Sequence, residues 1–129
     1  MNPTAQNLFD LTGHTALITG ASGFLGSAFA EALAEAGANV ICASRELERA
    51  QTSAERLTTK AGNRHFAVAL DQTDEASLNA GFDAALEAAG SIDILINNGH
   101  SGDAHDLTNA TAEHFDKVLA NATGYFLLA

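Results

Sequence analysis

The chain has very little cysteine, proline or tryptophan. Its 129 residues include one Cys, one Pro and no Trp. A single Cys cannot form an internal disulfide bond, and no Cys and His residues have the spacing of a zinc site, so we expect no metal. No apolar run approaches the roughly 20 residues of a membrane-spanning helix, and the first ten residues lack the basic and apolar regions of a secretory signal. We therefore expect a cytoplasmic protein that does not enter a membrane.

Basic residues are also scarce. Six Lys and Arg stand against 16 Asp and Glu, which gives a net charge of −10 and a pI near 4.6. Such an acidic chain is not expected to bind nucleic acid or an anionic membrane surface. The hydrophobic content of 47% and the mean hydropathy of +0.03 exclude a disordered acidic tail. As a prior, the length indicates one globular domain.

Four short apolar runs predict strands that are covered on both faces. They span residues 15–19, 39–43, 65–70 and 92–96, and they lack a strict alternation of apolar and polar residues. Right-handed crossovers between strands separated by helices then give a parallel sheet with helices on both faces. The sequence therefore predicts an α/β fold.

Helical spacing of apolar residues fills the gaps between these runs. Each of four sets forms one apolar stripe, as in helices that pack against a core: Leu25, Ala28, Phe29, Ala32, Leu33 and Ala36; Leu47, Ala50, Ala54, Leu57 and Ala61; Leu78, Phe82, Ala85, Leu86 and Ala89; and Phe115, Val118, Leu119, Ala122 and Phe126. Gly37, Gly62 and Gly90 are expected just past the first three helices. Thr73 or Asp74 is expected to cap the third helix, and Thr111 the fourth. Residues 98–110 are expected to form a long loop.

A glycine-rich turn connects the first strand to the first helix. Glycines at this place let the backbone approach a pyrophosphate closely, and the helix N-terminus adds N–H groups and partial positive charge. In this strand–turn–helix context the pattern predicts dinucleotide binding, with a plain tight turn as the alternative. The candidate cofactor-binding residues here are Gly20, Ala21, Ser22, Gly23, Phe24, Leu25 and Gly26.

Four motifs in this order resemble those of the short-chain dehydrogenases/reductases, over residues 9–129. They are Thr-Gly-Ala-Ser-Gly-Phe-Leu-Gly at 19–26, Asp-Gln-Thr-Asp at 71–74, Asn-Asn-Gly-His at 97–100, and Asn121 within 118–124. The resemblance implies a Rossmann-like doubly wound parallel sheet, truncated after the fourth βα unit. It also implies that residues 1–129 are the N-terminal part of a single dinucleotide-binding domain whose C-terminal catalytic half is absent.

The sequence departs from the family pattern at two places. Phe24 stands where the single-domain branch usually has Gly, and the G-x-x-G-x-x-G spacing is commoner in the extended branch; the strand-four segment and Asn121 fit the single-domain branch better. Gly99-His100 replaces the family's Ala-Gly. His100 would then lie near the nicotinamide, where it contacts cofactor or substrate, or it is a solvated loop histidine.

The end of the second strand indicates the choice of cofactor. Dehydrogenases that prefer NAD place an acidic side chain there for the ribose hydroxyls. This chain has Ser44 followed by Arg45, and a hydroxyl with a guanidinium suits a phosphate. We therefore expect NADP to be preferred over NAD. The alternative is that Arg45 is a solvated charge at the start of a helix.

The resemblance assigns roles to three further positions. Asp71 would reach toward the adenine with the Gln72 backbone beside it, although a carboxylate that caps the next helix is also compatible. Asn98 would lie along the ribose, with a simple turn as the alternative. Asn121 would hold a water in a proton relay to the active-site lysine, and is our candidate catalytic residue; a satisfied helix asparagine is the alternative.

The family's catalytic Tyr-x-x-x-Lys step has no match here. Tyr125 is the one tyrosine, and Ala129 stands where the lysine is needed. We expect Tyr125 to be a core or interface residue, Cys42 to be a core residue, and this chain alone to be inactive.

The resemblance implies that the full-length protein is an enzyme. It is expected to be an NAD(P)-dependent oxidoreductase that transfers a hydride between the cofactor and a small alcohol or carbonyl substrate. The alternative is a non-catalytic dinucleotide-binding module or a natural truncated relative. By resemblance the fourth helix packs on a neighbouring subunit, so we expect a homo-oligomer. The fourth strand is expected to be a bare sheet edge.

Overall fold

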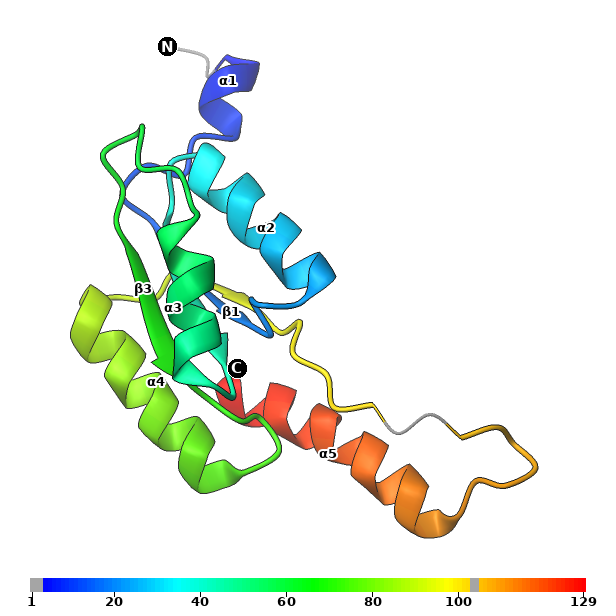
Figure 1. Ribbon diagram of the computed structural model, residues 1–129. Helices are drawn as coiled ribbons and strands as arrows, with labels where there is room; N and C mark the ends of the chain where they lie inside the picture. The colour runs from blue at the N-terminus through cyan, green and yellow to red at the C-terminus, as the bar shows by residue number, and fades with distance from the viewer. Residues whose placement is uncertain (1–3, 103–104) are drawn as a thin grey trace.

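Strands and helices alternate along the chain in the computed structural model, which describes residues 4–102 and 105–129 (Figure 1). The elements are α1 (Ala5–Leu8), β1 (Thr15–Thr19), α2 (Phe24–Glu35), β2 (Asn39–Ser44), α3 (Leu47–Glu55), β3 (His65–Ala69), α4 (Glu75–Ala89), β4 (Ile94–Ile96) and α5 (Ala112–Leu128). The four predicted strands and four predicted helices are confirmed. The short helix α1 was not expected. None of the described helices is long and apolar enough to cross a membrane.

The four strands form one parallel sheet in the order β3-β2-β1-β4. The chain moves outward from β1 to β3 and then crosses back to place β4 on the other side of β1. This reversal at β1 defines a Rossmann-like doubly wound sheet, as predicted. β1 and β2, the two central strands, are almost completely buried, which explains their continuous apolar sequence.

Two apolar cores lie on opposite faces of the sheet. On one face, α2 and α3 cover a cluster that includes Ile18, Val40 and Cys42. On the other face, α4 and the end of α5 cover a cluster that includes Leu17 and Ile41. Adjacent residues of β1 and β2 thus point to different cores, because side chains alternate along a strand. The N-terminal half of α5 extends away from the sheet together with the loop before it (Figure 1); positions 103 and 104 of that loop lie outside the described residues.

Helix caps agree with the sequence in most cases. Asp74, and not Thr73, caps α4 by accepting a hydrogen bond from the Ala76 N–H, and Thr111 caps α5. Gly90 ends α4 in the left-handed conformation that glycine favours. The expectation for Gly62 is wrong, because α3 already ends at Glu55. Gly62 instead closes a turn, in which its N–H donates to the Thr59 carbonyl.

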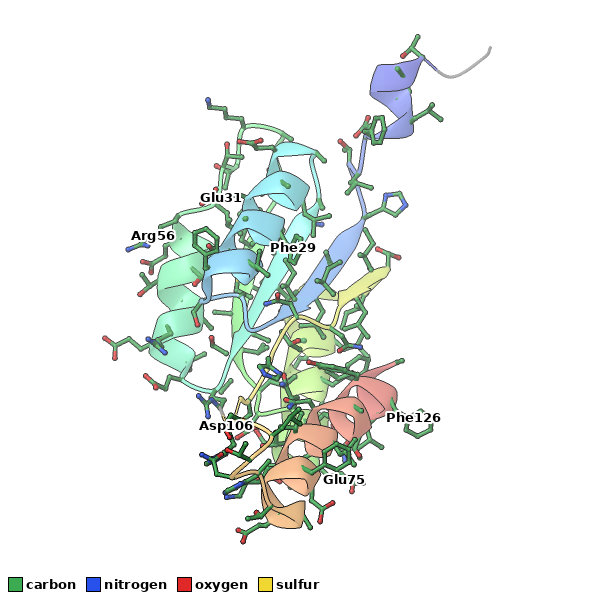
Figure 2. The ribbon with its side chains drawn as sticks, turned by 90° about the vertical axis from the view of Figure 1, so that its right-hand side faces the viewer. Phe29, Glu31, Arg56, Glu75, Asp106 and Phe126 are labelled. Atoms are coloured by element: carbon green, nitrogen blue, oxygen red, sulfur yellow. The ribbon has the colours of Figure 1, made fainter. Side chains whose placement is uncertain are left out.

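The apolar stripe of α5 and most of that of α2 do not face the core, contrary to the sequence pattern; Leu33 of α2 is the exception, since it packs against the core. In α5 the side chains of Phe115, Leu119 and Phe126 are 65%, 49% and 79% exposed, and Phe126 projects away from the molecule in Figure 2. The residues that α5 buries are Asn121, Gly124 and Leu128. In α2 the buried residues are Gly26, Ala30 and Ala34. Both helices therefore approach the sheet mainly along a face of small residues and, apart from Leu33 and Leu128, present their bulky apolar side chains outward.

Candidate functional site

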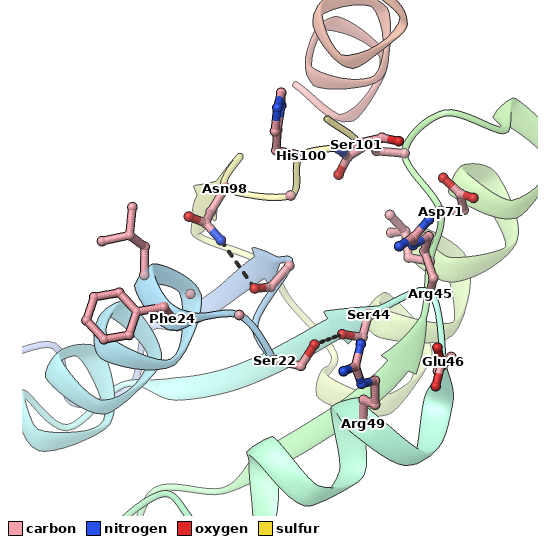
Figure 3. A pocket seen from close by; sticks show the side chains of 17 residues that line it. Ser22, Phe24, Ser44, Arg45, Glu46, Arg49, Asp71, Asn98, His100 and Ser101 are labelled. Atoms are coloured by element: carbon pink, nitrogen blue, oxygen red, sulfur yellow. Dashed lines mark hydrogen bonds between the residues drawn. The ribbon is translucent and has the colours of Figure 1, made fainter. Parts of the chain in front are cut away.

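A cavity of about 370 Å³ opens at the carboxyl ends of the strands (Figure 3). The turns after β1, β3 and β4 and the last residue of β2 all contribute to it, as expected at the switch point of a doubly wound sheet. Every candidate cofactor-binding residue except the buried Ala21 lines this cavity: Gly20, Ser22, Gly23, Phe24, Leu25, Gly26, Ser44, Arg45, Asp71, Gln72, Asn98, Gly99 and His100. Motifs separated by up to 80 positions are thus brought to one place.

The glycine turn is a close backbone crossing. Gly20 has a φ of +63°, which side chains rarely tolerate. A Cβ on Gly26 would lie closer than 3.0 Å to the Gly20 carbonyl and to the Asn98 side chain. Gly23 is less confined, since a Cβ there would lie 3.4 Å from the Gly20 oxygen. The turn therefore forms a backbone cradle that only glycine permits at its two ends.

Two helix N-termini at the cavity have no side-chain cap. The N-cap residues of α2 and α3 are Gly23 and Glu46, and neither makes a side-chain cap hydrogen bond. Both residues line the cavity, whereas α4 and α5, which are capped, begin elsewhere. The first N–H groups of α2 are thus available to an anion.

Two serines and two arginines form the polar side of the cavity. The Ser22 and Ser44 hydroxyl oxygens lie 2.6 Å apart and share a hydrogen bond. Figure 3 shows the Arg49 guanidinium beside Ser44, while Arg45 points toward Asp71. Within the described part of the chain neither arginine makes an ion pair with a carboxylate. Their charges are therefore available to an anionic ligand.

Asp71 forms a tight turn after β3. Its carboxylate accepts hydrogen bonds from the Thr73 hydroxyl at 2.7 Å and the Thr73 N–H at 2.9 Å. The hydroxyl contact, followed by the backbone contact and the Arg45 charge, lowers the pKa of Asp71 below its ordinary value. The carboxylate is therefore ionised at neutral pH. It does not cap α4, which was the alternative role, because Asp74 does.

Asn98 joins the end of β4 to the glycine turn. Its side-chain amide donates to the Thr19 and Gly20 carbonyl oxygens, each at 3.2 Å. In return, the Thr19 hydroxyl accepts hydrogen bonds from the N–H groups of Asn98 and Gly99. Asn98 therefore holds the cradle in shape, and it does so whether or not it also contacts a ribose.

Asn121 lies behind the cavity wall and does not line it. Its side-chain oxygen accepts from Gln72 Nε2 at 3.0 Å and from the Ser101 N–H at 2.9 Å. Its side-chain nitrogen donates to the Ser101 and Val118 carbonyl oxygens, both at 3.0 Å. All of its polar atoms are therefore used within the protein, which matches the satisfied-asparagine alternative.

Tyr125 and Cys42 occupy structural positions. The Tyr125 hydroxyl donates to the Gly99 carbonyl at 2.6 Å from the far side of the cavity wall. Cys42 is buried in β2, and burial raises the pKa of its thiol to about 12. In the described residues no group of three or more His, Cys, Asp or Glu is arranged to hold a metal ion.

Four lining residues were not among the sequence candidates: Glu46, Arg49, Leu70 and Ser101. Arg49 had a usable signal, since it lies in the first turn of the helix that begins just after β2. Ser101 follows His100 directly. Leu70 and Glu46 are ordinary apolar and acidic residues, and only the fold brings them to the cavity.

Positive charge is concentrated in one stretch of the sequence. Five of the six Lys and Arg residues lie between positions 45 and 64, and three acidic residues accompany them. Elsewhere the chain has a single basic residue, Lys117, and thirteen acidic ones. We call residues 45–64 the basic segment; it begins at the cavity with Arg45 and Arg49.

Comparison with known proteins gives a consistent result. The sequence model described as short chain dehydrogenase matches residues 14–129. The chain is 41% identical over 115 residues to the sorbitol dehydrogenase of Cereibacter sphaeroides, covering 88% of this chain and 43% of that protein. It is also 41% identical to the galactitol 2-dehydrogenase of Agrobacterium fabrum, covering 84% of this chain and 41% of that protein.

A solved structure shows the same similarity in three dimensions. The crystal structure of the 3-ketoacyl-(acyl-carrier-protein) reductase from Brucella melitensis, complexed with NADH, has a TM-score of 0.79 and 34% sequence identity. The match covers 92% of this chain and 48% of that one. This chain therefore spans less than half the length of each of these three proteins.

Proposed function

The chain belongs to the short-chain dehydrogenase/reductase family, and from this premise we propose that its cavity binds a nicotinamide dinucleotide. We also propose that residues 1–129 form the cofactor-binding part of a longer oxidoreductase domain. That protein would transfer a hydride between NAD(P) and a small alcohol or carbonyl compound. The sorbitol and galactitol dehydrogenases among the relatives support an alcohol as the substrate class.

The glycine cradle is the observation that carries the proposal. Gly20 and Gly26 let the turn pass close to Gly99, Asn98 and the start of α2, where a Cβ would collide with these neighbours. The turn thus presents its backbone to the cavity, and the uncapped α2 N-terminus lies beside it. A bare backbone with available N–H groups is what a pyrophosphate requires. The residues present therefore fit the group that the family uses.

Other lining residues suit the remaining parts of the cofactor. Leu70 and Asp71 border the place expected for the adenine, and Asn98 and His100 the wall expected for the nicotinamide ribose. When bound, the nicotinamide ring supplies hydride chemistry, which no side chain of this chain can supply. The protein's own part is to bind and orient the cofactor. For Asn121, we propose support of the cavity wall together with the relay role that the family implies.

We further propose that NADP is preferred over NAD. The Ser22–Ser44 hydroxyl pair and the guanidinium groups of Arg45 and Arg49 lie at the end of β2, where no carboxylate replaces Ser44. Hydrogen bonds from arginine to a phosphate are charge-assisted and directional. Arg45 also faces Asp71, whereas Arg49 lies beside Ser44 and, in the described part of the chain, makes no ion pair with a carboxylate, Glu46 of the cavity wall included.

Reversal of single charges tests the proposal. Arg45→Asp and Arg49→Asp are each expected to weaken NADPH binding at least about tenfold, because a charge-assisted hydrogen bond contributes roughly 1.5–3 kcal/mol. NADH binding should change little, since NADH lacks the 2′-phosphate. Titration calorimetry with both cofactors measures this shift. Asp is tolerated near a helix N-terminus, so folding should be preserved.

Arg56→Asp is the matched control. This substitution makes the same charge change at the other end of α3, outside the cavity. It should leave both affinities nearly unchanged. Equal losses in all three variants would mean that net charge alone matters, and unchanged NADPH affinity in both cavity variants would refute the NADP preference. A wild-type chain that binds neither cofactor would overturn the proposed function itself.

A further inference from the structure

Gln72 has an unusual place for a polar loop residue. It follows Asp71 in the turn after β3, yet it is only 9% exposed. Its side chain lines the cavity and donates a hydrogen bond to Asn121 at 3.0 Å. The donor and acceptor are 49 positions apart in sequence. This bond therefore connects the adenine-side turn with α5.

Asn121 is also hydrogen-bonded to Ser101, in the opposite wall of the cavity. Its amide group makes two hydrogen bonds with Ser101, one to the backbone N–H and one to the carbonyl oxygen. The Gly99 carbonyl, two residues earlier, accepts from the Tyr125 hydroxyl. Residues 99–101, which we call the wall segment, are thus held from α5 at both ends. Between these anchors His100 is exposed to the cavity.

Two glycines make room for Gln72. A Cβ on Gly99 would lie closer than 3.0 Å to Gln72 Oε1, and a Cβ on Gly124 would lie equally close to the Gln72 carbonyl oxygen. Neither glycine has a positive φ, so backbone conformation does not require glycine at these positions. The space they leave is taken by Gln72. The glutamine and the two glycines therefore form one packing unit.

From this geometry we propose that the Gln72 side chain is a positioning residue for dinucleotide binding. It fixes the wall segment in place through Asn121 and through its contact with Gly99, so that the adenine-side turn and the nicotinamide-side wall form one preassembled surface. The inference rests on the proposed function and deepens it. Preassembly matters because a wall that must be ordered on binding reduces affinity.

Comparing the binding of NADPH with that of its fragment 2′,5′-ADP distinguishes effects on the two sides of the cavity. Gln72→Met keeps the length of the side chain but removes its hydrogen-bonding groups. We expect this variant to bind NADPH about fivefold more weakly, because a single net hydrogen bond is worth roughly 0.5–1.5 kcal/mol. Binding of 2′,5′-ADP, which does not reach the wall segment, should stay within about twofold. Calorimetric titration of each ligand into the wild type and the variant gives the four dissociation constants.

Gln51→Met is the control for the chemical change itself. Gln51 is exposed on α3 and does not line the cavity. Its substitution should leave both affinities unchanged. If Gln72→Met weakened NADPH and 2′,5′-ADP equally, or changed neither, the proposed positioning role would be wrong. If the wild-type chain bound neither ligand, the proposed function would fail first, and the proposed role with it.

A stability cycle tests the packing unit without any cofactor. Gly99→Ala alone should lower the thermal midpoint, because its methyl group meets Gln72 Oε1. Gln72→Val removes that oxygen, so Gly99→Ala should cost clearly less in the Gln72→Val background than in the wild type. Additive effects would show that positions 72 and 99 are not coupled, and would overturn the proposal even if the ligand titrations had come out as expected.

Discussion

The glycines of this chain serve different purposes, which the sequence alone does not distinguish. Gly20 is needed for its positive φ, Gly26 for the close backbone crossing, and Gly99 for the side chain of Gln72. The predicted G-x-x-G-x-x-G pattern identified the first two. The role of Gly99 depends on a partner 27 positions earlier in the chain, and only the fold brings the two together.

Substitution of Gly26 should therefore be far more harmful than substitution of its neighbour Gly23. Gly26→Ala forces a methyl group against the Gly20 carbonyl, and crowding of this kind costs about 1–3 kcal/mol. For a chain of this size that corresponds to a thermal midpoint lower by several degrees, roughly 4–8 °C per kcal/mol. Circular dichroism melting measures it.

Gly23→Ala provides the comparison within the same turn. Its Cβ would meet the Gly20 oxygen at 3.4 Å, an ordinary van der Waals distance. A much smaller loss of stability is expected. Similar losses in the two variants would show that the crossing at Gly26 is not as tight as the structure indicates.

Arg49 and Tyr125 show the limit of motif-based site prediction. The resemblance to known motifs found nearly every residue of the cavity wall, because those motifs follow strand ends that converge in any doubly wound sheet. Arg49 lies on a helix outside the motifs. Tyr125 was expected to be a core or interface residue, and its hydroxyl contact with Gly99 could not be foreseen, since it depends on the path of the loop before α5.

The helices α2 and α5 illustrate where sequence periodicity fails. Strand positions followed directly from apolar runs, but the apolar stripes of these two helices were assigned to the wrong side. The small residues of α2 and α5 permit closer contact with the backbone than Leu or Phe would, as at Gly124 and the Gln72 carbonyl. Periodicity measures where bulky apolar groups lie; it does not say which face meets the sheet.

The exposed stripe of α5, made of Phe115, Val118, Leu119 and Phe126, is expected to mediate self-association. Leu119→Glu places a charge at its centre and should weaken association about tenfold or more, because burial of a leucine is worth roughly 1.5–3 kcal/mol. The thermal midpoint of the monomer should not fall, since Leu119 is 49% exposed. Sedimentation velocity over a concentration series measures the change.

Leu107→Glu is the appropriate control, because Leu107 is 99% exposed and lies in the loop before α5. It should leave the sedimentation behaviour unchanged. If Leu119→Glu also had no effect, or if the wild type sedimented as a monomer at every concentration, the expectation of a homo-oligomer built on this stripe would be wrong.

The described residues combine a well-formed cavity with no match to the family's Tyr-x-x-x-Lys step. The Tyr125 hydroxyl donates a hydrogen bond to the Gly99 carbonyl. Ala129 occupies the position at which a Tyr-x-x-x-Lys motif that begins at Tyr125 would have its lysine. No described side chain at the cavity replaces that pair. The chain's similarity to the sorbitol and galactitol dehydrogenases extends over less than half of the length of each.

We therefore expect the 129-residue chain to bind NADPH without turning it over. Oxidation of NADPH, followed by its absorbance with a panel of ketones and aldehydes, should not exceed the rate in buffer. The same sample must bind NADPH in a titration, which shows that it is folded. Turnover by a sequence-verified, purified sample would contradict this expectation.

The basic segment has a practical consequence for handling the molecule. Residues 45–64 hold five of its six Lys and Arg side chains, and the remainder is strongly acidic. On a support that carries fixed amines, the acidic remainder makes the contact, within the roughly 10 Å over which charges act in dilute buffer. The acidic side chains of α4 and α5 lie on the face of the sheet opposite α3, so the chain would be immobilised with α3 facing the liquid. Adsorption would thus orient the molecule without a tag or a covalent linker.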